Sequence, residues 1–189
     1  MVYHIMPLTI QVITKKAARN MSKKQAQHAA AGQVRTNAMR LLDQAGISYS
    51  TQEYEYDEDH LGGDHVVKQL GIDPETCFKT LVARGEKRGI MVFCIPVLEE
   101  LDLKKAAIVT GDKKIEMVHV KELFGLTGYI RGGCTPIGMK KKYPTYIEET
   151  ALLFDRIYLS GGQRGVQIVI DPQDLIDFVE AEPCEIVKG

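Results

Sequence analysis

The sequence predicts an α+β fold, a single domain in which short helices surround a mixed β-sheet. Strand-like segments are interspersed with short helical segments, without the regular strand–helix alternation of a parallel sheet. The chain has 189 residues, of which 44% are hydrophobic and 26% are charged, so it is long enough to bury one core. We expect the folded domain over residues 34–189, after a poorly ordered extension over residues 1–33.

The domain is predicted to begin with a helix, a strand and a second helix. Apolar residues recur at helical spacing from Val34 until Gly46, where the helix ends. Residues 47–56 then alternate as a strand does. Asp64 is the expected N-cap of a short helix that stops at Gly71, a glycine typical of helix C-termini.

A β-hairpin is predicted next. Residues 78–83 and 90–97 are apolar runs joined by the loop sequence RGEKRG. Asp102 and Gly111 then bracket a capped helix. A short strand over residues 113–118 and a short helix over residues 119–126 follow.

The last third of the domain combines a structured loop region with a strand pair and a helix. Glycine and proline punctuate residues 127–145, which indicates turns between short strands. Residues 156–160 and 165–170 read as two strands joined by a short turn. Asp171 as N-cap and Pro172 at the first helical position start the final helix.

Charge balance, cysteine spacing and hydropathy argue against a strongly basic nucleic-acid-binding protein, a disulfide-rich protein and a membrane-spanning protein. The 24 Lys and Arg residues nearly balance the 25 Asp and Glu residues, so a nucleic acid would have to be held by a local cluster. The four cysteines are far apart and form no C-x-x-C pair, which favours free thiols in a reducing cytoplasm. No apolar run has the length of a membrane span.

Lys79 interrupts an apolar strand and is the first candidate for chemistry. Period two places Lys79 on the face of Leu81 and Ala83, opposite Phe78 and Thr80. The spacing alone favours a lysine at a strand end, whose ammonium reaches water over Leu81. A role in a substrate site is the alternative.

Two glycine pairs are the other candidates. Gly132–Gly133 and Gly161–Gly162 bring backbone N–H groups within reach of a ligand, where they would stabilise an oxyanion; an isolated glycine pair is more commonly a turn. Cys134 has no candidate base near it in sequence, which argues against a nucleophile.

The remaining polar residues show no metal-ligand spacing. His60, His65 and His119 fit neither a metal site nor a triad. The lysines over residues 140–142 read as a solvated surface, or as a site for a polyanion, because they follow a glycine loop. The residues alone therefore predict a site that handles an acyl group or a phosphate.

The motifs FKTLV, LDLKKAA, KKIEM, TGYIRGGCTPIGMKKKYPT, RIYLSGGQRG and DPQDLIDFV occur in this order. Together they resemble the YbaK/EbsC-like family of bacterial Cys-tRNA(Pro) deacylases, which is related to the editing domain of prolyl-tRNA synthetase. The resemblance covers residues 34–182. It implies a barrel-like mixed sheet wrapped by short helices.

The resemblance also implies an activity: trans-editing hydrolysis of the ester in mischarged Cys-tRNA(Pro), in which the substrate thiol attacks its own ester without a cofactor or a metal. Lys79 matches the family's catalytic lysine. The matching substrate-binding residues are Tyr54, Thr80, Gly132, Gly133, Pro136, Ser160, Gly161 and Gly162. Gln167 stands where some relatives carry an aspartate, so no role is assigned to it, and the choice between Tyr54 and Tyr56 stays open.

The implied partners are the acceptor end of tRNA(Pro) carrying cysteine and, transiently, prolyl-tRNA synthetase, in the cytoplasm and without a membrane. Two alternatives remain at this stage. One is a deacylase with another preference, such as alanine, which would need an activated water because its substrate has no thiol. The other is a module that binds tRNA or a synthetase without catalysis.

Overall fold

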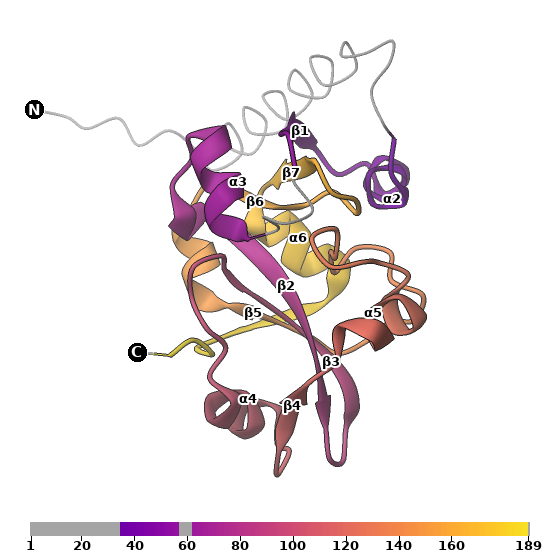
Figure 1. The fold of residues 1–189 in the computed structure, drawn as a ribbon, viewed down its shortest axis with the longest axis vertical. Coiled ribbons are helices and arrows are strands. Elements are labelled where there is room, and N and C mark those ends of the chain that lie inside the picture. The colour runs from indigo at the N-terminus through magenta and orange to yellow at the C-terminus, as the bar shows by residue number, and fades with distance from the viewer. Residues whose placement is uncertain (1–34, 57–61, 189) are drawn as a thin grey trace, which may run out of the picture. The chain divides into compact units, whose positions relative to one another are not determined.

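The computed structural model describes residues 35–56 and 62–188, so the predicted extension over residues 1–33 lies outside the described residues. The helices are α2 (Asn37–Ala45), α3 (Gly63–Leu70), α4 (Leu103–Thr110), α5 (Val120–Thr127) and α6 (Pro172–Val179), with 3-10 turns η2 (Pro74–Thr76) and η3 (Glu149–Leu153). The strands are β1 (Tyr49–Glu53), β2 (Cys77–Gly85), β3 (Gly89–Pro96), β4 (Ile115–Met117), β5 (Thr145–Glu148), β6 (Ile157–Ser160), β7 (Val166–Ile170) and β8 (Ala181–Cys184). Figure 1 shows these elements around the long strands β2 and β3.

Helix capping follows the sequence closely. The Asp102 side chain accepts hydrogen bonds from the first turn of α4, and the Asp171 side chain does so for α6. The prediction of Asp64 as an N-cap was wrong, because α3 begins at Gly63 and its N-cap is Gly62, two residues before Asp64. Asp64 lies instead in the first turn, where the helix dipole favours a carboxylate.

The sheet is mixed, as the sequence predicts. Within the described residues it has eight strands in the order β1-β7-β6-β2-β3-β5-β8, and β4 pairs with β2 off this path. The β2–β3, β1–β7 and β6–β7 pairs are antiparallel, while β2–β6, β3–β5 and β5–β8 are parallel. The order ends at β1 and β8, so the pairing does not close into a full barrel.

Each face of the sheet buries its own apolar cluster. On one face, α2 and α6 cover Phe78 of β2 and the apolar residues of β6 and β7. On the other face, α3 covers Cys77 near one end of β2, and α4 covers Ala83 near the other end. We call the face covered by α3 and α4 the α3/α4 face. It carries Cys77, Lys79, Leu81 and Ala83 of β2.

The C-terminal segment is held against the domain by a buried carboxylate. Glu148, at the end of β5, is 2% exposed. Its Oε2 accepts hydrogen bonds from the backbone N–H groups of Ile186 at 2.8 Å and Val187 at 3.1 Å. Ile186 is itself fully buried, and its carbonyl accepts a second backbone hydrogen bond, from the N–H of Asp102.

In the part of the chain that the structure describes, no helix combines the length and apolar character that crossing a lipid bilayer requires.

Candidate functional site

The candidate site lies where the pairing along one edge of β2 is interrupted. On this edge β6 pairs only with Cys77 and Phe78, and β4 pairs only with residues 83–85. Between the two, the edge of β2 has no strand partner among the described residues. Lys79 and Thr80 fall in this interruption, and both glycine loops lie near it.

A row of three polar side chains crosses the α3/α4 face beside this interruption. Phe78 pairs with Leu159, so Lys79 and Ser160 are the next residues of two parallel strands and share one face. Ser160 in turn pairs directly with Gln167 across the antiparallel β6–β7 ladder. We call Lys79, Ser160 and Gln167 the polar row.

Lys79 is half-buried, and its ammonium is held by a backbone carbonyl. Its Nζ donates a hydrogen bond to the carbonyl of Val97 at 2.9 Å, which leaves two of its three N–H donors for other partners. Burial lowers the pKa of the Lys79 ammonium below its usual value, and the carboxylates of Glu100 and Glu99 partly oppose this shift. The lysine therefore does not simply extend into water over Leu81.

Gln167 is the residue of this row that sequence reasoning left without a role. It is 5% exposed, yet its amide oxygen Oε1 has no hydrogen-bond partner within the described residues. A buried amide oxygen without a partner destabilises the folded state, and such groups in native structures commonly bind a ligand or a water. The sequence signal was an isolated glutamine in an apolar strand.

Ser160 connects the row to the second glycine pair. Its Oγ accepts a hydrogen bond from the N–H of Gly162 at 3.3 Å, so the serine proton is free to be donated elsewhere. Gly162 has a φ of +97°, which a residue with a side chain rarely adopts. This turn therefore requires its glycine, and the N–H of Gly162 is directed to the serine.

The first glycine loop rests directly on the second. A methyl group at Gly133 would lie 3.0 Å from the backbone Cα of Gln163, so the two loops touch through their main chains. The side chain of Arg164 adds a hydrogen bond from its Nε to the carbonyl of Arg131 at 3.0 Å. Gly132 has a φ of +85°, and Pro136 is buried where the loop turns back into the core.

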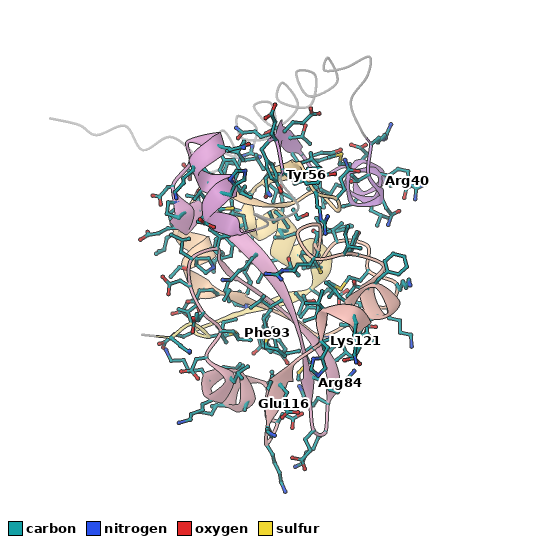
Figure 2. All side chains as sticks on the ribbon, viewed as in Figure 1. Arg40, Tyr56, Arg84, Phe93, Glu116 and Lys121 are labelled. Atoms are coloured by element: carbon teal, nitrogen blue, oxygen red, sulfur yellow. The ribbon has the colours of Figure 1, made fainter. Side chains whose placement is uncertain are left out.

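The structure separates Thr80 from the polar row. Its side chain is on the opposite face, 3.9 Å from the Sγ of Cys94. Tyr54 extends β1 by one residue, since its N–H donates to the carbonyl of Gly165. Because side chains alternate along a strand, Tyr54 lies on the same face as Gln52, which is the strand partner of Gln167. Tyr56 is 50% exposed, and Figure 2 shows it beside β1 and β7 at the end of the domain away from Arg84.

The structure thus places Lys79 and Ser160 side by side on one face of the sheet, with Tyr54 on the same face. Ser160 leads into the second glycine loop, which touches the first. The thiols of the protein are poorly suited to act as nucleophiles here, because burial raises the pKa of each one to about 12. This holds for Cys77, Cys94, Cys134 and Cys184. No group of three His, Cys, Asp or Glu side chains within residues 35–56 and 62–188 is arranged to hold a metal ion.

Two of the three lysines over residues 140–142 are engaged within the protein. Lys140 donates to the carbonyl of Phe124 at 2.9 Å and lies over the ring of the same residue, 4.6 Å from its centroid. Lys142 forms an ion pair with Glu180. Lys141 is exposed and is the member of the three best placed to meet an external phosphate.

Comparison with known proteins places this chain in a family. Residues 64–178 match the model of the aminoacyl-tRNA editing domain. A protein of Enterococcus faecalis named "Putative Cys-tRNA(Pro)/Cys-tRNA(Cys) deacylase EbsC" is 47% identical over 154 residues, which is 82% of this chain and 94% of that protein.

Solved structures show the same fold. One, described as a "putative trans-editing enzyme for prolyl tRNA synthetase", is 23% identical, with a TM-score of 0.71 over 82% of this chain and 100% of the other. A second, of a protein described as hypothetical, is 17% identical, with a TM-score of 0.72 over 79% of this chain and 97% of the other. The chain belongs to the aminoacyl-tRNA editing domain family.

Proposed function

We propose that this protein is a trans-editing deacylase that hydrolyses the ester of mischarged Cys-tRNA(Pro). The observation that carries the proposal is the polar row of Lys79, Ser160 and Gln167 beside two touching glycine loops, in a chain 47% identical to a protein named as a Cys-tRNA deacylase. The match extends over 94% of that relative, so the comparison concerns the whole domain.

The proposed chemistry uses the thiol of the substrate. The sulfur attacks the ester carbonyl, a C–S bond forms, and the bond from the carbonyl carbon to the ribose oxygen breaks. The proton of the thiol ends on that ribose oxygen, and the cyclic thioester of cysteine then hydrolyses in water. The protein contributes orientation and charge stabilisation, and its own thiols, with their raised pKa values, stay out of the reaction.

The polar row supplies three different groups to the substrate. The Lys79 ammonium retains two N–H donors for the developing oxyanion or for a phosphate at the tRNA 3′ end. The Ser160 hydroxyl offers a proton donor, since its oxygen already accepts from Gly162. The Gln167 amide oxygen offers a buried acceptor for the α-amino group or the thiol.

The test is deacylation of Cys-tRNA(Pro), Ser-tRNA(Pro), Ala-tRNA(Pro) and Pro-tRNA(Pro) in parallel. We expect rapid loss of cysteine alone, because serine and alanine have no thiol that can displace the ribose oxygen. The matched pair is cysteine and serine, which differ only in sulfur against oxygen. Hydrolysis of Ala-tRNA(Pro) at a similar rate would replace this proposal with a water-activating deacylase. Binding without turnover of any of the four would replace it with a binding module.

Replacing Gln167 tests whether its unpartnered amide oxygen accepts a hydrogen bond from the substrate. We expect Gln167→Leu to lower kcat/KM for Cys-tRNA(Pro) by about tenfold, the effect of one lost hydrogen bond of about 1.4 kcal/mol. The same variant should not be less stable to urea, since the oxygen that it removes has no partner within the described part of the protein. Unchanged kcat/KM together with raised stability would show that the glutamine does not touch substrate.

For recognition of the tRNA, we propose that the acceptor end enters at the polar row and that Lys141 contacts a backbone phosphate. A near-neutral net charge predicts modest and salt-sensitive affinity for free tRNA. Selection of tRNA(Pro) would then come from a transient complex with prolyl-tRNA synthetase.

A further inference from the structure

We propose that the backbone N–H and C=O of Thr80 bind the aminoacyl group of the substrate, as one residue of a short β-bridge. This inference rests on the deacylase function proposed above and names the groups that hold its substrate. It assigns a role to Thr80 through its main chain, whereas its side chain lies on the other face beside Cys94.

The direction of the Thr80 backbone groups follows from the β2–β3 ladder. In an antiparallel pair, opposite residues alternate between those that exchange hydrogen bonds and those that do not. The N–H of Val97 donates to the carbonyl of Cys77, which marks the odd-numbered residues of β2 as those facing β3. Thr80 and Cys94 are therefore a pair without mutual backbone hydrogen bonds, and the N–H and C=O of Thr80 point to the opposite edge of β2.

Two further hydrogen bonds agree with this alternation. The carbonyl of Val82 points to the same outer edge as Thr80, because it accepts from the N–H of Val118 at 3.0 Å. On β3, the N–H of Val92, which is the partner of Val82, points away from β2 and donates to the carbonyl of Pro144. Even-numbered residues of β2 thus present their backbone groups to the outer edge.

At this outer edge Thr80 has no backbone partner within the described residues. The β6 pairing ends at Phe78 and the β4 pairing begins at Ala83. Ser160, the last residue of β6, precedes the glycine turn, and the two glycine loops touch through Gly133. The first of these loops returns to β2 through Cys134, which packs against Val82. The open backbone groups of Thr80 are therefore bordered by the residues of the candidate site.

An aminoacyl ester is complementary to this arrangement. An α-amino group and the neighbouring carbonyl oxygen match the N–H and C=O that one strand residue presents on one edge. The carbonyl of Thr80 accepts from the α-amino group, and the N–H of Thr80 donates to the ester carbonyl, where it also stabilises the oxyanion. Lys79 and Ser160 then approach the same group from the α3/α4 face.

The experiment exchanges one backbone N–H for oxygen. Full-length protein is made by cell-free translation, with a suppressor tRNA inserting α-hydroxy acids, so that an ester replaces the peptide bond between Lys79 and Thr80. The matched control is an ester between Leu81 and Val82. Both esters weaken a carbonyl that faces β3, but only the first removes the Thr80 N–H.

Two readouts separate this inference from the proposed function. The first is kcat/KM for Cys-tRNA(Pro), expected to fall about 100-fold in the Thr80 ester relative to the Val82 ester. The second is the Kd of the stable amide 3′-cysteinylamino-3′-deoxyadenosine, expected to rise about tenfold in the same comparison. Inactive wild-type protein would overturn the deacylase function, while the Kd comparison would still decide the role of Thr80. Equal Kd values for the two esters would overturn the Thr80 inference.

The acceptor half of the bridge is tested with a second probe. The 3-mercaptopropionyl amide of 3′-amino-3′-deoxyadenosine keeps the thiol and the carbonyl but lacks the α-amino group. Wild-type protein should bind it about tenfold more weakly than the cysteinyl compound. Equal affinity would remove the Thr80 carbonyl from the bridge.

Discussion

Lys79→Ala should lower kcat/KM for Cys-tRNA(Pro) by about 100-fold or more, the usual effect of removing a donor that stabilises an oxyanion. The lysine is the charged member of the polar row, and two of its three N–H donors are uncommitted. The rate should be measured under single-turnover conditions, so that product release does not mask the chemical step. A well-folded Lys79→Ala protein with normal activity would remove Lys79 from the site.

Lys79→Met is the control for folding. Because burial lowers the pKa of Lys79 in the folded state, the buried charge opposes folding at pH values below that lowered pKa. This cost disappears as the pH rises through the folded-state pKa toward the value of the unfolded chain. Lys79→Met should therefore resist urea at pH 7 at least as well as the wild type, while it loses activity. A loss of stability would point to a structural role for the hydrogen bond to Val97.

The same lowered pKa predicts where activity ends at alkaline pH. If the ammonium form acts on the substrate, wild-type activity falls as the pH rises through the folded-state pKa of Lys79, below the usual value for lysine. Whatever activity Lys79→Arg retains should not show this fall, since arginine stays charged. Spontaneous ester hydrolysis is subtracted at each pH.

Glu148→Leu should lower the free energy of unfolding by roughly 3 kcal/mol, because it leaves one buried and one partly buried backbone N–H group without an acceptor. These are the N–H groups of Ile186 and Val187, which both donate to one carboxylate oxygen of Glu148. Urea denaturation followed by circular dichroism measures the effect.

Glu148→Gln is the matched variant, since its amide oxygen still accepts from the backbone. We expect it to lose only about 1 kcal/mol, the charge-assisted part of the two hydrogen bonds. If the leucine and glutamine variants are equally stable, the two hydrogen bonds do not hold the C-terminal segment. Deacylation by the glutamine variant also shows whether anchoring of the C-terminal segment affects activity.

Local structure could be predicted well from the sequence because short-range signals determine it. The caps Asp102 and Asp171 start their helices as expected. The hairpin of β2 and β3 forms at the predicted place, and period two puts Lys79 on the face of Leu81. The strands β5 and β8 were missed. β8 consists of Ala, Glu, Pro and Cys, and its pairing with β5 is decided by long-range packing.

The candidate site itself depends on register between distant strands, which no local pattern encodes. Ser160 lies beside Lys79 only because β6 joins β2 in parallel with Phe78 opposite Leu159. Gln167 joins the row through the β6–β7 pairing. That its amide oxygen is buried without a hydrogen-bond partner among the described residues can be recognised only from the surrounding packing. The resemblance implies roles for Lys79, Ser160 and Thr80, but it does not distinguish the side chain of Thr80 from the main chain, which we propose as the binding group.

The interruption along β2 also bears on aggregation. An unpaired strand edge is a template on which another chain can add a strand, and proteins protect such edges. Here strands on both sides limit the open segment to the backbone groups around Thr80, a length that suits a single residue and is too short for a foreign strand. An interruption of the size that we propose for one aminoacyl group is thus too short to pair with a polypeptide strand. Substitutions that shorten the β4 or β6 pairing should therefore be judged by solubility as well as by activity.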